Sequence, residues 1–165
     1  MIHTARLFLE PLSVKDSDFI IELVNTKGWR SFIGHRNINT RTEAAAYINK
    51  YASENDTNIW TVKLIETKTP IGIITLLKRE YLKHKDLGFA FLPEYFNKGY
   101  AFEASDAVLK DLNKKNKCEI IEAITVPENL SSVRLLKKLG FDYDKEIMVD
   151  NKIMCAYIFE MTDQL

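Results

Sequence analysis

Residues 92–103 read Leu-Pro-Glu-Tyr-Phe-Asn-Lys-Gly-Tyr-Ala-Phe-Glu, and this stretch is typical of a chain that leaves a strand and enters a helix. An apolar, strand-like run at residues 87–92 leads into it. The first backbone N–H groups of a helix lack partners inside the helix, and the helix dipole adds partial positive charge there. Gly99 opens the backbone to a ligand, Ala101 keeps the next turn nearly as bare, and Lys98 adds a cation. The stretch therefore predicts a binding site for a phosphate-bearing cofactor.

This turn is not one of the common nucleotide-binding loops. The chain contains no G-x-x-x-x-G-K-[ST] motif, and Gly88 and Gly99 are too far apart for G-x-G-x-x-G. Taken alone, the stretch would be explained better by a tight strand-to-helix turn without a ligand. A second motif follows another apolar run, at residues 119–126. Residues 126–141 read Val-Pro-Glu-Asn-Leu-Ser-Ser-Val-Arg-Leu-Leu-Lys-Lys-Leu-Gly-Phe.

Together the two motifs resemble those of the GNAT acetyltransferases. The resemblance is closest to the RimJ/RimL-like branch, which acetylates protein N-termini and assorted small amines. From Phe89 the chain reads Phe-x-Phe-Leu-Pro-Glu-Tyr-Phe-x-Lys-Gly-Tyr-Ala-x-Glu-Ala, and from Asn129 it reads Asn-x-x-Ser-x-x-x-Leu-x-Lys-x-Gly-Phe. Residues 4–12, Thr-Ala-Arg-Leu-Phe-Leu-Glu-Pro-Leu, also look like that branch's first strand. One position departs from the pattern, since Asn97 replaces the glycine usual in this branch.

The residue pattern alone favours an α/β or α+β domain with one layered sheet. The resemblance implies the GNAT fold, a mixed and twisted sheet of about seven strands with helices on both faces. Expected strands cover residues 5–10, 58–66, 71–78, 86–92, 118–126, 141–149 and 153–161. Expected helices cover residues 13–25, 40–52, 100–115 and 130–139, and residues 28–34 are expected to be irregular and aromatic.

Composition sets broad limits on the function. With 165 residues and 46% hydrophobic content, the chain is expected to form one domain, residues 1–165. Its 23 basic and 23 acidic residues cancel, which argues against nucleic-acid binding by phosphate neutralisation. No apolar run approaches the length of a membrane span, so no membrane partner is expected. Cys118 and Cys155 lie in apolar runs without metal-ligand spacing, which predicts reduced core cysteines in a cytoplasmic protein without a bound metal.

The resemblance implies how acetyl-CoA would bind. The strand at 87–92 would splay from the strand at 119–126, with the pantetheine arm in the gap. The backbone of Phe91 and Leu92 would pair with that arm, and the amides of Lys98, Gly99 and Ala101 would hold the pyrophosphate. The other positions expected to contact the cofactor are Asn97, Tyr100, Phe102, Asn129, Ser132 and Lys138.

Asn129 and Ser132 stand at the expected start of a helix, where Asn and Ser are also favoured as caps. For Asn129, capping and cofactor contact are equally good interpretations, and one residue can do both. The superfamily often places a tyrosine acid at the position of Leu136, which cannot donate a proton. Ser132 is therefore the best candidate to hydrogen-bond the leaving sulfur, as in the RimL-like pattern.

The general base has three candidates, Asp86, Glu103 and Glu122. Glu103 has a strong alternative role, because an acidic residue in the first helical turn complements the dipole. Asp86 could be a solvated strand end. Glu122 lies in an apolar strand, where a carboxylate needs a partner or a polar cleft, so it is the most interesting of the three. The histidines, His3, His35 and His84, are scattered and read as surface residues.

The acceptor is predicted to be a primary amine, either a peptide N-terminus or a small molecule such as an amino acid, polyamine or antibiotic. About a tenth of an α-amine with a pKa near 8 is neutral at pH 7, whereas deprotonating a lysine there costs roughly 4–5 kcal/mol. The lack of an obvious base therefore favours an α-amine. Trp29, Phe32 and Trp60 are candidates to line the acceptor site, although large aromatics are more often core. A non-catalytic CoA-binding module is the alternative from another class, and both a monomer and a homodimer remain open.

Overall fold

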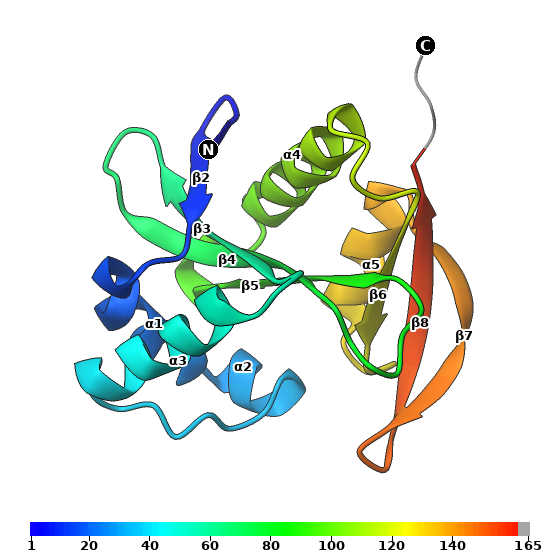
Figure 1. The fold of residues 1–165 in the computed structure, drawn as a ribbon, viewed down its shortest axis with the longest axis horizontal. Helices are drawn as coiled ribbons and strands as arrows, with labels where there is room; N and C mark the ends of the chain where they lie inside the picture. The colour runs from blue at the N-terminus through cyan, green and yellow to red at the C-terminus, as the bar shows by residue number, and fades with distance from the viewer. Residues whose placement is uncertain (162–165) are drawn as a thin grey trace.

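The computed structural model describes residues 1–161, which form one eight-stranded sheet with helices on both faces (Figure 1). The strands are β1 (Ile2–His3), β2 (Leu7–Pro11), β3 (Asn58–Leu64), β4 (Pro70–Leu77), β5 (Lys85–Phe91), β6 (Ile120–Thr125), β7 (Asp142–Val149) and β8 (Lys152–Glu160). The α-helices are α1 (Ser17–Val24), α2 (Lys27–Phe32), α3 (Arg41–Ser53), α4 (Tyr100–Lys114) and α5 (Leu130–Leu139), and the 3₁₀ turns are η1 (Val14–Asp16) and η2 (Pro93–Tyr95).

The strands are ordered β1-β2-β3-β4-β5-β6-β8-β7 across the sheet. Every neighbouring pair is antiparallel except β5 and β6, which run parallel in the middle. The final hairpin turns at Asp150 and Asn151, whose φ angles of 48° and 60° are those that tight hairpin turns require. The predicted mixed sheet is confirmed, including this turn.

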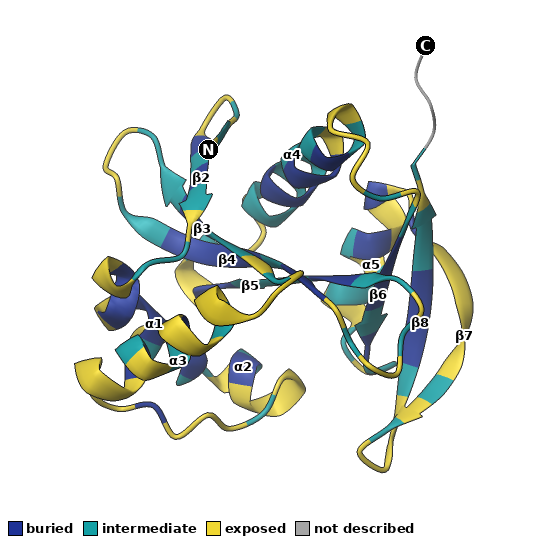
Figure 2. Cartoon of the chain, in the orientation of Figure 1, coloured by how far each residue is buried: buried dark blue, intermediate teal, exposed yellow. Residues whose placement is uncertain are grey.

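Two apolar cores hold the helices to the sheet. On one face, α4 and α5 pack through residues such as Val108 and Leu136 against Leu87 and Ile121. On the other face, α1–α3 enclose a second core that includes Trp29. Figure 2 shows the buried residues concentrated in the central strands and on the inner sides of the helices. Each face of the sheet therefore has its own core, one under α4 and α5 and the other under α1–α3.

Three expectations need correction. Residues 28–34 are not irregular throughout, because Lys27–Phe32 form α2, which Thr26 caps by accepting a hydrogen bond from the Trp29 N–H at 3.3 Å. Burial of Trp29 provides the stabilisation that the local pattern lacks. The sheet has eight strands rather than about seven, because the two residues of β1 pair with β2. The first helix starts with a 3₁₀ turn, η1, and becomes α-helical only at Ser17.

No helix among residues 1–161 is long and apolar enough to cross a membrane. The same residues contain no cluster of three or more His, Cys, Asp or Glu side chains that could hold a metal ion.

Candidate functional site

The central feature of the sheet is the divergence of β5 and β6. These strands are joined by two registered pairs at their amino ends, Lys85 with Ile121 and Asp86 with Glu122. Beyond Asp86, β5 continues to pair with β4 on its other side as far as Phe91, while β6 pairs with β8. The predicted splay is confirmed, and in the described chain it leaves one edge of each strand open toward the gap.

The direction of the backbone groups follows from the pairing with β4. The Leu92 N–H donates to the Ile71 carbonyl at 2.9 Å, and backbone groups alternate in direction along a strand. Phe89 and Phe91 therefore present their N–H and C=O groups to the gap, whereas Leu92 has already used its N–H. Phe91 can thus pair with an added extended chain. The Leu92 carbonyl accepts from the Tyr95 N–H at 3.0 Å, so a backbone contact of Leu92 with the cofactor stays a prediction.

Both diverging strands lead directly into helices. The chain passes from β5 through η2 into α4 and from β6 through a short turn into α5. Because β5 and β6 are parallel, both helix N-termini stand at the open end of the gap. Free N–H groups and the positive ends of two helix dipoles meet at that end, which suits an anionic ligand.

The turn before α4, residues 96–101, has the backbone form that an anion-binding turn needs; we call it the phosphate turn. Asn97 and Gly99 both adopt left-handed conformations, with φ of 59° and 80°, and Gly99 is the N-cap of α4. The first hydrogen bond within the helix runs from the Glu103 N–H to the Gly99 carbonyl at 3.0 Å, so the N–H groups of residues 100–102 precede it. A Cβ at Gly99 would meet a single neighbour, the Arg6 Nη2 at 3.4 Å. The free N–H groups and the bare backbone at Gly99 fit a pyrophosphate group. Asn97, which departs from the family pattern, takes a left-handed conformation that Asn tolerates better than most residues.

Sequence reasoning missed the partner of this turn, Arg6. Its Nε donates to Glu103 Oε2 at 2.7 Å, and its Nη1 donates to the Lys98 carbonyl at 3.0 Å. Glu103 Oε1 accepts from the Thr4 hydroxyl at 2.6 Å and from the Arg6 N–H at 3.0 Å. Partial burial would raise the pKa of Glu103, but these hydrogen bonds from Thr4 and Arg6 lower it below its usual value. Glu103 is thus an ion-pair partner with both oxygens engaged, which leaves it poorly suited to act as a base.

The other two base candidates come together at the closed end of the gap. Asp86 and Glu122 are in register on adjacent parallel strands, and they are 4% and 6% exposed. Leu87 and Ile121, their neighbours along the strands, belong to the core under α4 and α5. Because side chains alternate along a strand, Asp86 and Glu122 both point to the face that carries α1–α3. We call them the carboxylate pair.

The environment of Asp86 sets the pKa of this carboxyl above its ordinary value. Burial raises the pKa of Asp86, and the charge and hydrogen bond of Arg79, with a hydrogen bond from the Ile124 N–H, offset only part of that rise. The Arg79 Nε lies 3.2 Å from Asp86 Oδ2, and the neighbouring Glu122 adds to the upward shift. Glu122 itself accepts a hydrogen bond from the His84 N–H at 3.3 Å. A buried carboxyl with a raised pKa beside a second carboxylate is a common feature of proton-transfer sites.

Next to the carboxylate pair, on the same face, the backbone of β5 packs closely against Thr75. Gly88 follows Asp86 on this side of β5, and a Cβ there would meet the Thr75 Oγ1 at 2.5 Å. The position therefore requires glycine, and the Thr75 hydroxyl is the polar group that lies over it.

The start of α5 behaves as predicted for a helix cap. The Asn129 side chain accepts from the Ser132 N–H at 3.3 Å and from the Ser131 hydroxyl at 3.0 Å. Among the described residues no hydrogen bond involves the Ser132 hydroxyl, which leaves it available to a ligand. Leu136, one turn further on, is buried in the core and has no polar atom in its side chain. Capping by Asn129 is confirmed, and its contact with a cofactor stays a prediction.

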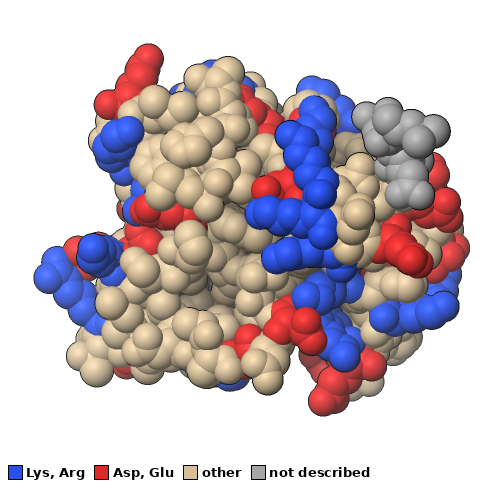
Figure 3. Space-filling model, turned by 45° about the horizontal axis from the view of Figure 1, so that its top comes forward, with Lys and Arg blue, Asp and Glu red and all other residues tan. Residues whose placement is uncertain are grey.

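Two lysine ammonium groups lie over aromatic rings of η2 and of the first turn of α4. The Lys138 ammonium is 4.4 Å from the Phe102 ring centroid, and the Lys98 ammonium is 5.6 Å from that of Tyr95. Figure 3 shows Lys and Arg side chains gathered in a band over the region of α4 and α5. This face is locally basic in a chain whose formal net charge is zero.

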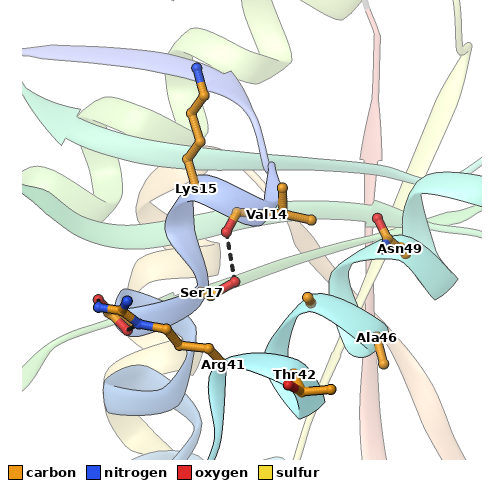
Figure 4. Close-up of a pocket in the computed structure, with 9 residues that line it drawn as sticks. Val14, Lys15, Ser17, Arg41, Thr42, Ala46 and Asn49 are labelled. Carbon is orange, nitrogen blue, oxygen red and sulfur yellow. Dashed lines mark hydrogen bonds and ion pairs between the residues drawn. The ribbon is translucent and has the colours of Figure 1, made fainter.

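The three aromatic residues predicted for the acceptor are not brought together. Trp29 is buried in the core under α1–α3, Phe32 is exposed on α2, and Trp60 is half-buried on β3, two strands away from β5. An open groove does lie between η1, α1 and α3, where Arg41 pairs with Asp18 at 2.6 Å (Figure 4). None of the predicted cofactor residues lines that groove.

Comparison with known proteins agrees with this geometry. A family model described as an acetyltransferase (GNAT) domain matches residues 6–142. The uncharacterized N-acetyltransferase YnaD of Bacillus subtilis (strain 168) is 32% identical over 139 residues, which span 84% of this chain and 81% of that protein. A crystal structure of a GNAT-family acetyltransferase from Bacillus anthracis is 27% identical with a TM-score of 0.82, and the match covers 97% of this chain and 98% of the other.

Two solved structures at lower identity share the fold. Spermidine N-acetyltransferase from Vibrio cholerae, in complex with CoA and spermine, is 19% identical with a TM-score of 0.82, over 96% of this chain and 97% of the other. The ribosomal-protein-S5-alanine acetyltransferase from Vibrio fischeri is 16% identical with a TM-score of 0.81, over 99% of this chain and 97% of the other. The family model spans β2 to the start of β7, including the splayed strands, the phosphate turn and both helix starts. This chain is a member of the GNAT acetyltransferase family.

Proposed function

We propose that this protein moves an acetyl group from acetyl-CoA to a primary amine by direct attack in a ternary complex. The proposal rests on the position of the carboxylate pair relative to the phosphate turn. The pair closes one end of the gap between β5 and β6, and two helix N-termini stand at the other end. From Asp86 to Phe91 an extended strand covers about 17 Å. A donor bound by its phosphates and extended along the gap would present its thioester close to the carboxylates.

Acetyl-CoA supplies an activated acyl group, and the protein has to bind it, align the amine and take up a proton. We assign the pyrophosphate to the amides of Lys98, Gly99 and Ala101. The pantetheine arm is assigned to the open backbone of Phe91 and to the adjoining Leu92. The assigned contacts also include Asn97, Tyr100, Phe102, Asn129, Ser132 and Lys138.

The carboxylate pair serves as the base in this proposal. A protonated amine must lose a proton before it can attack, and either Asp86 or Glu122 can accept it directly or through water. The raised pKa of Asp86 brings that carboxyl closer to the working pH, where a general base is most effective. The Ser132 hydroxyl donates a hydrogen bond to the departing sulfur.

For the acceptor we favour the α-amine of a peptide or protein N-terminus, as in the RimJ/RimL-like branch. An α-amine loses its proton far more readily than a lysine side chain does. The only bases assigned to this site are the two carboxylates of the pair, which are weak bases and therefore suit the α-amine better. A small cationic amine is the second candidate, because two adjacent carboxylates can hold a positive charge. Trp29, Phe32 and Trp60 remain candidates for acceptor contacts, although they lie apart from one another.

A thiol-release assay with acetyl-CoA tests this proposal. The acceptors are a peptide with a free N-terminus and no lysine, an N-acetylated peptide with one lysine, and spermidine. We expect turnover with the first peptide above the other two. Calorimetric binding of CoA without turnover on any acceptor would instead support a non-catalytic CoA-binding module.

A further inference from the structure

We propose that Arg6 is a positioning residue that holds the phosphate turn in its anion-binding form. The inference rests on the proposed function, since it concerns how the same site takes up CoA. Arg6 lies just before β2, outside both motifs, and no part of it has to touch the cofactor.

Arg6 contacts the phosphate turn with several groups at once. Its Nη1 donates to the Lys98 carbonyl at 3.0 Å, and its guanidinium carbon lies 4.4 Å from the centroid of the Tyr100 ring. Its Nη2 lies 2.6 Å from Glu103 Oε2 and would be the nearest neighbour of a Cβ on Gly99. One side chain thus contacts residues on both sides of Gly99.

The contact with the Lys98 carbonyl sets the direction of the next N–H group. That carbonyl and the Gly99 N–H belong to one planar trans peptide unit, so they point in opposite directions. When Arg6 holds the carbonyl on its side, the Gly99 N–H is directed away from Arg6. On either side of Lys98, Asn97 and Gly99 are left-handed, with φ of 59° and 80°. This conformation costs little for glycine but is of higher energy for Asn97, which therefore has to be held by its surroundings.

Arg6 also neutralises the negative charge of Glu103 next to the phosphate turn. Glu103 lies in the first turn of α4, and its side chain is 18% exposed. Without a cationic partner its carboxylate would repel a phosphate at the same helix start. The planar guanidinium can pair with that carboxylate and with the Lys98 carbonyl at the same time, which the single ammonium of a lysine does less well.

The alternative is that Arg6 merely fastens the start of β2 to α4. Such a role predicts a loss of stability without a specific effect on the phosphate turn. The chain offers a matched control, Arg41, which makes a similar two-point pair with Asp18, at 2.6 Å for both Nε and Nη2, far from the turn in sequence.

The test compares wild-type protein, Arg6→Gln and Arg41→Gln, each below its unfolding temperature. Titration calorimetry should show CoA affinity reduced about tenfold or more in Arg6→Gln and within twofold of wild type in Arg41→Gln. In ¹⁵N–¹H spectra, inorganic pyrophosphate should shift the Gly99 amide resonance of wild type and Arg41→Gln but not that of Arg6→Gln.

Wild-type CoA affinity in folded Arg6→Gln, or equal losses in both variants, would overturn the positioning role. If Arg6→Gln does not fold, Arg6→Lys takes its place, with the same thresholds. Failure of the wild-type protein to bind CoA would contradict the proposed function and this inference together. Normal CoA binding without acetyl transfer would contradict the proposed function alone.

Discussion

Asp86 and Glu122 lie side by side at the last residue pair that joins β5 to β6, and both are buried. Beyond this pair the strands separate, and the helices that follow them begin at the far end of the gap. Burial, and to a smaller extent the neighbouring Glu122, raise the pKa of Asp86, which suits that carboxyl to take up a proton.

Replacing Asp86 should separate activity from stability. Burial raises the folded-state pKa of Asp86 above the unfolded value of 3.8, so the folded state binds more protons than the unfolded state between those two pKa values. The contribution of Asp86 to the free energy of unfolding is therefore fully present below pH 3.8. That contribution is lost as the pH rises through the folded-state pKa of Asp86. Asp86→Asn should raise the midpoint of thermal unfolding at pH 7 and lower kcat by about 10-fold or more.

The control for that variant is Asp106→Asn, which removes a surface carboxylate paired with Lys110 at 2.7 Å. Neither its unfolding midpoint nor its kcat should change appreciably. An Asp86→Asn protein that is less stable than wild type at pH 7, or one with unchanged kcat, would contradict the role given to the pair.

Gly99→Glu should abolish CoA binding. The φ of 80° already disfavours a side chain at Gly99, and the carboxylate would add negative charge where the pyrophosphate is expected. Gly140→Ala is the matched control, because Gly140 has a φ of 96° at the end of α5 and its new Cβ would meet the Phe159 ring at 3.3 Å. It should lose stability but keep its CoA affinity in calorimetry. A folded Gly99→Glu protein with wild-type affinity would place the pyrophosphate elsewhere.

Ser132→Ala should lower kcat with little change in CoA affinity. Removing one transition-state donor commonly costs about 10²–10³ in kcat, and we expect a smaller loss because water can replace part of a hydroxyl's role. Ser131→Ala is the control, since that hydroxyl is occupied by its hydrogen bond to Asn129. Equal kcat values for Ser132→Ala and wild type under saturating substrates would mean that the Ser132 hydroxyl has no part in catalysis.

Asn129 can be tested for its two roles separately. Asn129→Ala should cost about 1 kcal/mol of stability, because the cap of α5 is lost. Asn129→Asp keeps an acceptor for the Ser132 N–H but adds a negative charge at the open end of the gap. It should keep the thermal midpoint and weaken CoA binding, and unchanged binding would indicate that Asn129 acts as a cap alone.

The sequence predicted those parts of the site that depend on local rules. The helix start after Gly99, the cap at Asn129 and the hairpin at Asp150–Asn151 each follow from a few neighbouring residues. The splay between β5 and β6 came from the family resemblance, and the structure confirms it.

Tertiary contacts were beyond local reasoning. Arg6 and Glu103 are separated by 97 positions, and nothing near either residue indicates the other. The helix at Lys27–Phe32 was missed because it contains Gly28 and depends on burial of Trp29 rather than on apolar periodicity. The same limit applies to Asp86 and Glu122, which were separate candidates until the sheet register placed them together.

We expect acetyl transfer from acetyl-CoA to an α-amine, with the carboxylate pair as base. The most direct test is a competition between two matched peptides in one reaction, one with a free N-terminus and a blocked lysine, the other with a blocked N-terminus and a free lysine. Mass spectrometry should detect acetylation of the first peptide in excess, and the Asp86→Asn, Glu122→Gln double variant should lose about 10²-fold of that rate. Exclusive acetylation of the lysine peptide, or an undiminished rate in the double variant, would contradict the account.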